Sequence, residues 1–286
     1  GDNPVLSYQE ILYIVHDRVA TITLNRPDQL NALTDRTQAE IRHALDQTET
    51  NGAVIGSVLT GAGRGFCAGV DMNVLGAMSD AGKRTERDMD ALKASPGNPD
   101  HDENYLGSPT YFLGLRKPLI AAVNGACAGL GFSFATFCDL RFMETQAKIV
   151  SSFGPRGLIA EHGTSWMLPR LVGPANALDI FWSSRKIEGE EAFRMGWANR
   201  LCAPGQAKLE AEAYLRAIAD TSAPTSIMMM KRQVYKHLNR ELGPAMQEST
   251  RWMDDSLARD DFKEGVASFV ERRPPSFAEL KIEERD

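Results

Sequence analysis

The chain has 286 residues, of which 43% are hydrophobic and 24% are charged, as in a globular protein that buries a large core. Its net charge of −6 comes from acidic and basic residues mixed along the chain, which argues against a general nucleic-acid-binding protein. The four cysteines show neither a C-x-x-C pair nor histidine partners at zinc-ligand spacing. We therefore expect free thiols, no metal and a cytoplasmic protein. The N-terminal residues GDNPVLSYQE do not form the pattern of a signal peptide.

The N-terminal third of the chain predicts strands and one helix. The segment ILYIVHDRVATITLNRP indicates two strands joined by a tight His-Asp-Arg turn. Thr34 is a suitable N-cap for a helix to about Thr48, because Ile41, Ala44 and Leu45 then share one face. A buried strand, AVIGSVLTG, follows and leads into the glycine-rich segment GAGRGFCAGVDM. Residues 77–104 are a polar excursion before the pattern resumes at YFLGLRKPLIAAV.

Residues 119–138, LIAAVNGACAGLGFSFATFC, contain no charged side chain. Asn124, Ser133, Thr136 and three glycines interrupt this apolar run, and no other run in the chain is long enough to span a membrane. We therefore predict a buried strand (LIAAV), a turn (NG) and a buried helix (LGFSFATF). The sequence predicts no membrane span.

The second half of the chain predicts one more strand, AKIVSSFGP, and then helices from about Gly163 onward. Breaks are expected at Pro174, Gly189, Pro204 and Pro224. The pattern divides the chain into a core of strand-strand-helix units over residues 1–205 and a helical region over residues 206–286.

Two segments rich in small residues are able to present bare backbone N–H groups. The glycines of GAGRGFCAGVDM satisfy neither G-x-G-x-x-G nor G-x-x-x-x-G-K-[ST], so dinucleotide and nucleotide loops are excluded. In NGACAGLG, a helix that begins near Gly129 leaves its first N–H groups without partners. Such donors stabilise an oxyanion. Taken singly, the first segment is more often just a glycine-rich turn, and close helix packing explains the glycines of the second segment equally well.

Several motifs in combination resemble the crotonase (enoyl-CoA hydratase/isomerase) family. They are LNRPDQLNAL, FCAGVDM, AAVNGACAGLG, FCDLRF, LPRLVGPANALDI and EGVASFVERRPP. The resemblance runs from about Leu12 to Phe277. It implies an α/β fold, a spiral of ββα units with a C-terminal helical region that mediates trimers, often paired into hexamers. It also implies an acyl-CoA thioester substrate, with coenzyme A as part of the substrate and no separate cofactor.

The resemblance also implies the site residues. The backbone N–H groups of Val70 and Leu130 match the two donors that stabilise a thioester enolate. The adenine and pantetheine would lie beside Ala68, Asp71 and Met72. Gly129 would allow a ligand to approach the backbone closely, and residues 77–104 would wall the acyl pocket.

Three further positions concern coenzyme A. Leu30 stands where many relatives carry a basic residue, so Arg26 is expected to serve the phosphates instead. Phe269 and Arg272 match positions that reach coenzyme A in relatives, although a solvated tail charge is an equal explanation for Arg272. We expect Asp139 to be structural.

The reaction depends on which acids are present. The family's hydratases use two glutamates, and Ser133 and Phe153 occupy the matching positions here. Glu161, in GLIAEHGTSW, matches a segment in which the family's isomerases carry a catalytic acid. One carboxylate is able to remove a proton next to the thioester and return it at the far carbon, provided that the enolate is stabilised. We therefore expect a double-bond isomerase with Glu161 as its base, and a packing or hydrogen-bonding role for His162.

Other interpretations stay open. Glu161 also suits the N-terminus of a helix, where negative charge is favourable. The alternatives to isomerisation are an enoyl-CoA hydratase with an unusual base, an enzyme of thioester hydrolysis or decarboxylation, and a non-catalytic acyl-CoA-binding protein. The apolar faces beyond Gly205, such as SIMMMKRQVYKHL, predict a homotrimer or a dimer of trimers.

Overall fold

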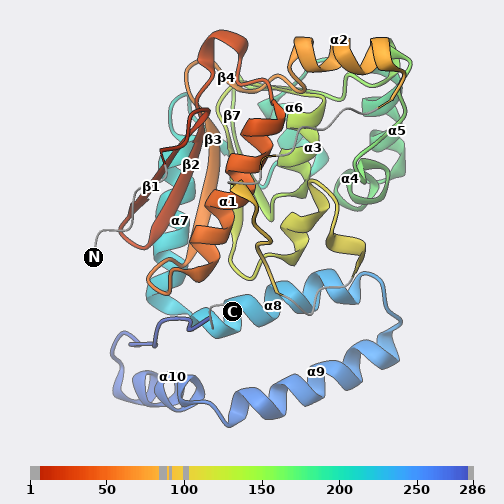
Figure 1. Cartoon of the computed structure of the whole chain (residues 1–286). Helices are drawn as coiled ribbons and strands as arrows, with labels where there is room; N and C mark the ends of the chain where they lie inside the picture. Colours follow the sequence, from red (N-terminus) through yellow and green to blue (C-terminus); the bar gives the residue numbers. More distant parts are fainter. Residues whose placement is uncertain (1–6, 84–88, 90–91, 99–102, 283–286) are drawn as a thin grey trace.

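The computed structural model describes residues 7–83, 89, 92–98 and 103–282 (Figure 1). Part of the predicted excursion over residues 77–104 therefore lies outside the described residues. Two sheets form the core, one of six strands in the order β1-β2-β3-β5-β7-β10 and one of four in the order β4-β6-β8-β9. Within the described ranges, no helix is long and apolar enough to cross a membrane.

The N-terminal elements follow the sequence pattern. Strands β1 (Ile11–His16) and β2 (Val19–Leu24) pair antiparallel across a turn at Asp17 and Arg18, both of which have positive φ. A 3-10 turn, η1 (Pro27–Gln29), leads to α1 (Asp35–Thr50). The Thr34 side chain accepts a hydrogen bond from the Thr37 N–H and so caps α1, as predicted.

Three successive units place their first strand in the large sheet and their second strand in the small sheet, with a helix after them. The strands of the large sheet are β3 (Gly56–Gly61), β5 (Leu119–Val123) and β7 (Leu140–Glu144), and those of the small sheet are β4 (Gly65–Cys67), β6 (Ala126–Ala128) and β8 (Lys148–Val150). The helices after them are α2 (Met72–Ala81), α3 (Leu130–Phe137), and the pair α4 (Thr164–Val172) and α5 (Pro174–Ser183). This repetition confirms the predicted spiral of ββα units.

Four short strands contradict the sequence analysis, which placed turns or helices there. Strands β4 and β6 pair with each other, β9 (Ile187–Glu188) pairs with β8, and β10 (Arg200–Cys202) pairs with β7. Helix α6 (Gly189–Met195) separates β9 from β10. These strands are two or three residues long and take their partners from distant segments, so no local alternation of side chains reveals them.

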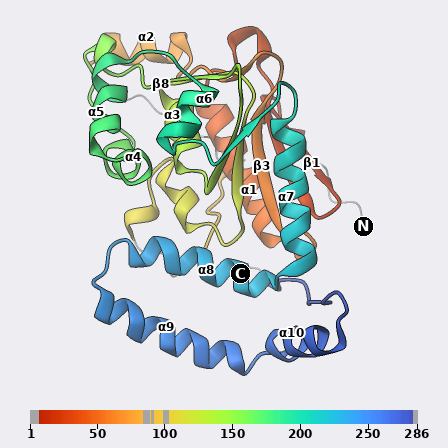
Figure 2. The same ribbon diagram turned by 180° about the vertical axis from the view of Figure 1, so that it is seen from behind.

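The charge-free strand β5 is buried on both of its faces. Leu119, Ala121 and Val123 belong to the main core, whereas Ile120 and Ala122 belong to a second core on the other face of the sheet. Helix α7 (Ala207–Thr221) covers this second face (Figure 2). A strand that is covered on both sides reads as a continuous apolar run, which explains the segment LIAAV.

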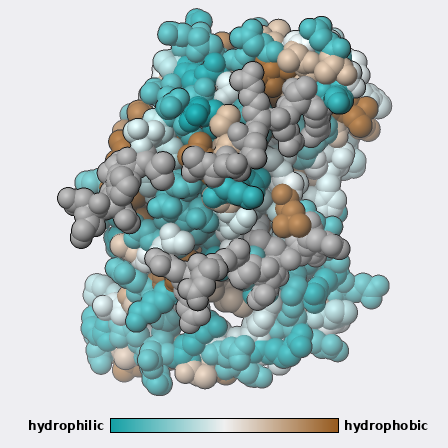
Figure 3. Space-filling view, in the orientation of Figure 1, coloured by the Kyte–Doolittle hydropathy of each residue, from teal (hydrophilic) through white to brown (hydrophobic). Residues whose placement is uncertain are grey.

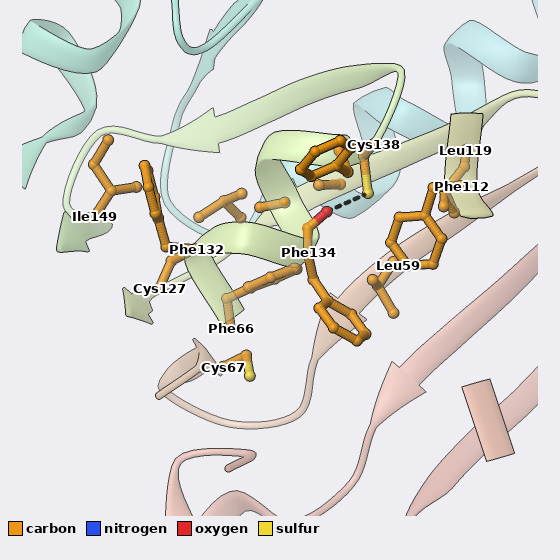
Figure 4. Packing of buried hydrophobic residues seen from close by; sticks show 14 of the residues in the cluster. Leu59, Phe66, Cys67, Phe112, Leu119, Cys127, Phe132, Phe134, Cys138 and Ile149 are labelled. Atoms are coloured by element: carbon orange, nitrogen blue, oxygen red, sulfur yellow. Dashed lines mark hydrogen bonds between the residues drawn. The ribbon is translucent and has the colours of Figure 1, made fainter. Parts of the chain in front are cut away.

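Helix α3 lies inside the molecule, and all of its residues are buried. Figure 4 shows Phe132 on the side of Cys127 and Ile149, and Phe134 beside Phe112 and Leu59. The rings of Phe112 and Phe134 meet edge to face, with centroids 5.4 Å apart. The apolar run of residues 119–138 is therefore explained by burial in the core.

Three C-terminal helices form a separate layer beneath the core (Figures 1 and 2). They are α8 (Pro224–His237), α9 (Leu242–Leu257) and α10 (Asp260–Glu271). Figure 3 shows an opening between α8 and the outer part of this layer. The helices after residue 205 differ in their packing. Helix α7 belongs to the core, α8 packs on the core through Ile227 and Tyr235, and α9 and α10 form the outer part of the layer.

Candidate active site

A cavity of about 1210 Å³ opens between α1, α2 and the loop that precedes α4. Val70, Leu130 and Glu161 all line it, although they come from three separate ββα units. Further walls come from α2 and from the described part of the excursion over residues 77–104, including Met78, Leu92 and others. The predicted catalytic residues therefore share one cavity.

The N–H group of Val70 points away from Leu33, the residue with which Val70 pairs. Leu33 forms an isolated parallel bridge with Val70. In this bridge the Leu33 N–H donates to the Gly69 carbonyl (2.7 Å), and the Leu33 carbonyl accepts from the Asp71 N–H (2.9 Å). In a parallel pair these two bonds bracket Val70, so the N–H of Val70 itself points to the opposite side.

The N–H group of Leu130 is the first in helix α3, whose N-cap is Gly129. The first N–H groups of a helix have no acceptor within the helix, and the helix dipole favours negative charge beside them. Gly69 lies next to this position with φ of 104°, and a Cβ built on it would come within 3.6 Å of the Leu130 nitrogen and 3.1 Å of the Ala128 oxygen. Glycine at 69 therefore lets the Val70 loop and the start of α3 approach each other.

Gly131 serves packing. A Cβ at this position would lie 2.7 Å from the Cys67 sulfur and closer still to the Cys67 carbonyl oxygen. The start of α3 therefore rests directly on the backbone at the end of β4. For this glycine of the NGACAGLG segment, the geometry supports close helix packing.

The buried side chain of Asn31 fastens the glycine-rich segment. Its Nδ2 donates to the carbonyl oxygens of Ala62 (2.9 Å) and Gly65 (2.8 Å), and its Oδ1 accepts from the Arg26 N–H (2.9 Å). The sequence analysis gave Asn31 no role. Its position in the motif LNRPDQLNAL is the only hint of this role in the sequence. Asn31 has a left-handed φ of 58°, which asparagine tolerates better than most residues.

Asp71 and Arg26 form a pair that lies outside the cavity lining. The Asp71 carboxylate caps α2 by accepting from the Asn73 N–H (2.9 Å), and the Arg26 guanidinium donates to it at 3.0 Å. Burial by itself raises the pKa of Asp71, but the Asn73 N–H and the Arg26 guanidinium outweigh it and hold the pKa below its ordinary value. Arg26 also donates to the Ala32 carbonyl. The guanidinium that was expected to meet phosphates is thus engaged with the protein itself.

The remaining residues that the family resemblance assigned to coenzyme A are dispersed. Met72 is 70% exposed and lines the cavity, whereas the N–H of Ala68 donates to the Leu30 carbonyl (3.0 Å). Phe269 is 84% exposed on α10, and Arg272 is the C-cap of that helix. Neither residue lines the cavity of its own chain, and Figure 1 shows α10 at the opposite end of the molecule from α2.

Glu161 lies in a turn immediately before α4. Its carbonyl accepts from the N–H and the hydroxyl of Thr164, which starts the helix, and its side chain is 29% exposed toward the cavity. The Nε2 atom of His162 lies 3.4 Å from Oε1 of Glu161, and His162 also lines the cavity. The imidazole is therefore placed beside the carboxylate that it would orient.

The two hydratase-type positions hold no acid and do not line the cavity. Ser133 is fully buried, and its hydroxyl donates to the Gly129 carbonyl (3.3 Å). Phe153 is buried against Phe181. Asp139, expected to be structural, accepts from the Leu119 N–H (2.7 Å) and the Lys231 ammonium (2.7 Å).

The sequence analysis missed several polar residues that line the cavity. Asp35 and Arg42 face it from α1, and the cations Lys83, Lys93 and Arg156 face it from other segments. Nothing in the local pattern of α1 distinguishes these positions from an ordinary solvated face. Over the described residues, no group of three or more His, Cys, Asp or Glu side chains is placed to hold a metal ion.

A spiral of ββα units that brings two backbone donors to one cavity defines a class, the crotonase fold. A solved structure of an enoyl-CoA hydratase/isomerase from Mycobacterium paratuberculosis superposes with a TM-score of 0.81 at 27% identity, covering 95% of this chain and 99% of that chain.

The sequence comparisons agree with this class. A family model described as enoyl-CoA hydratase/isomerase matches residues 15–280. A probable enoyl-CoA hydratase of Rhizobium meliloti is 33% identical over 272 residues, 95% of this chain and 99% of the relative. A 1,2-epoxyphenylacetyl-CoA isomerase of Escherichia coli is 30% identical over 268 residues, 93% of this chain and 97% of the relative. The chain belongs to the enoyl-CoA hydratase/isomerase family of the crotonase superfamily, and is an enzyme of that family.

Proposed function

We propose that this protein isomerises a double bond in an acyl-CoA thioester, with Glu161 as the base. The observation that carries the proposal is that Glu161 lines the same cavity as Val70 and Leu130. The thioester oxygen would lie between the N–H groups of Val70 and Leu130, where charge that develops during reaction is stabilised by fixed dipoles.

The proton balance of this reaction needs a single carboxylate. In a 3-enoyl thioester, Glu161 removes a proton from C2, and the electron pair moves into the thioester to form a dienolate. The protonated Glu161 then returns the proton to C4, while the double bond forms between C2 and C3. No atom is gained or lost, and Glu161 ends ionised as it began. The dienolate forms at a useful rate because the two N–H donors stabilise its negatively charged oxygen.

Enoyl-CoA hydratase activity is a second candidate, because Asp35 provides another carboxylate on the cavity wall. Hydration requires groups that activate water and manage the proton at C2. Ser133 and Phe153 supply neither, since both are buried away from the cavity. Asp35 and Glu161 would then have to share these tasks.

Turnover of matched 2-enoyl and 3-enoyl thioesters separates the two candidates. We expect interconversion of the two esters without a 3-hydroxyacyl product. Glu161→Gln keeps the shape of the side chain and should lower kcat by about 10²–10⁴, the usual contribution of one general base, with nearly unchanged affinity for the ester. Asp35→Asn is the matched control on the same cavity and should retain isomerisation. Formation of a hydroxyacyl product that depends on both carboxylates would replace isomerisation with hydration.

We also propose that the chain acts as a trimer or a dimer of trimers. Large apolar side chains are exposed on the C-terminal layer, among them Val234, Leu242, Met246, Met253 and Val270. Exposed apolar side chains that gather on one layer are typical of a protein–protein interface. Sedimentation should therefore give three or six chains per particle, and a stable monomer at micromolar concentration would contradict it. In such an assembly, Phe269 and Arg272 would be free to approach the coenzyme A site of another subunit.

A further inference from the structure

One wall of the cavity is a polar stripe along α1. Asp35, Gln38, Ala39 and Arg42 all line the cavity, and their spacing places them on one face of the helix. Asp35 lies two residues after Leu33, the bridge partner of Val70, and so marks the end of the stripe nearest the proposed donor. Arg42 lies about 10 Å farther along, by the rise of an α-helix over seven residues.

Arg42 is held in place by an aromatic ring. Its guanidinium carbon lies 4.0 Å from the ring centroid of Tyr111, which is only 4% exposed. This cation–π contact uses the positive charge but none of the five N–H donors of the guanidinium. Tyr111 belongs to η4 (Thr110–Gly114), a buried segment of the main core. The charge of Arg42 is therefore held against the main core at a residue that lines the cavity.

Arg42 has no carboxylate partner among the described residues, in contrast to Arg26 and Arg116. Arg26 donates to Asp71, and Arg116 pairs with Glu49 and donates to the Gly97 carbonyl. The neutral polar side chains of Gln38 and Ser108 line the cavity with Arg42. A plain hydrocarbon chain placed here would remove water from a guanidinium without replacing its hydrogen bonds, which is unfavourable.

We propose that the cavity selects acyl-CoA thioesters whose acyl group ends in a carboxylate, which binds the Arg42 guanidinium. This inference rests on the proposed function, since it requires an acyl thioester in the cavity. A carboxylate matches the planar fork of arginine and accepts two charge-assisted hydrogen bonds from it. Asp35 would lie at the thioester end, away from the anionic end of the acyl group. The apolar side chains Val74, Leu75 and Met78 of α2 would contact the methylene groups between the two ends.

Calorimetric titration with two pairs of saturated esters tests the proposal without requiring turnover. The pairs are adipoyl-CoA with hexanoyl-CoA and suberoyl-CoA with octanoyl-CoA. In at least one pair, the ester that ends in a carboxylate should bind about 10- to 100-fold more tightly, as expected for hydrogen bonds to a charged group. Arg42→Met should abolish this preference, and Arg42→Lys should retain part of it, which also shows that the effect is not a failure to fold.

Arg170→Met is the matched control. The Arg170 guanidinium also stacks on an aromatic ring, 3.9 Å from the centroid of Trp166, but Arg170 does not line the cavity. This variant should show the preference of the wild type. Equal binding within both pairs by the wild type would overturn the proposal. An equal loss for all four esters in Arg42→Met would also overturn it, because it would assign Arg42 to the coenzyme A phosphates. Absence of binding by every ester would instead overturn the proposed function together with this inference.

Discussion

The two sides of the cavity are built by different means. The donor side is fixed by the core: Val70 is bracketed by the hydrogen bonds of Leu33, and Leu130 begins a helix whose residues are all buried. Glu161 on the other side lies in a turn, preceded by Leu158 and Ile159, which are 43% and 81% exposed. Substitutions on the donor side should therefore lower the free energy of unfolding. A substitution of Glu161 should lower kcat and leave the free energy of unfolding unchanged.

The largest expected effect lies on the turn side. The loss of about 10²–10⁴ in kcat expected for Glu161→Gln should come with an unfolding temperature close to that of the wild type. The capping hydrogen bonds at Glu161 involve its backbone carbonyl, which glutamine retains. Thermal unfolding of the purified variant measures this. A large drop in melting temperature would show that the carboxylate also supports the fold, and the contrast between the two sides would fail.

Gly131→Ala tests the donor side. The added methyl group would clash with the Cys67 backbone and sulfur, so α3 and β4 would have to move apart. Overpacking of this kind should lower the free energy of unfolding by about 1–3 kcal/mol and displace the Leu130 donor. Chemical denaturation measures the loss. Gly243→Ala, in α9, has nothing within 4 Å of the added methyl group and should cause no loss. Equal stability of the two variants would contradict the close approach of α3 to β4.

Asp71 supports the donor loop through its charge. Because its pKa is lower in the folded protein than the unfolded value near 3.9, its contribution is complete above that value and is lost as the pH falls through the folded pKa. Asp71→Asn should therefore lower the free energy of unfolding at pH 7 by about 1–3 kcal/mol and flatten its dependence on pH below about 4. Denaturation across the acid range measures both. Arg26→Met should reproduce part of this loss, and additive effects in the double variant would show that the two side chains do not interact.

Ser133→Ala should have the smallest effect. The variant loses one buried hydrogen bond to the Gly129 carbonyl, worth about 1 kcal/mol. Its kcat should stay near the wild-type value, because a hydroxyl outside the cavity is no base for the substrate. Steady-state kinetics beside those of Glu161→Gln checks this. An inactive Ser133→Ala together with an active Glu161→Gln would move the chemistry to α3 and leave Glu161 as a helix cap.

Much of the fold could be predicted from the sequence because its signals are local. The Thr34 cap and the apolar run of β5 each follow from a few neighbouring residues. The motifs around Val70, Leu130 and Glu161 were also sufficient to name residues that prove to share a cavity. The strands β4, β6, β9 and β10 could not be predicted, because two or three residues become a strand only when a distant partner lies beside them.

The contacts of the charged residues around the site follow only from the tertiary structure. The sequence could not show that Arg26 is engaged by Asp71, 45 positions away, or that the Arg42 guanidinium stacks on Tyr111 and has no carboxylate partner among the described residues. Ion pairs and hydrogen bonds between side chains depend on distances between segments that are far apart in the sequence. The spacing of apolar residues, every 2 residues in a strand and about every 3.6 in a helix, gives no information on these distances. The sequence by itself determined the class of fold and predicted Val70 and Leu130 as donors, since both depend on the backbone and on local packing. Only the folded chain determined which charges are free to meet a substrate.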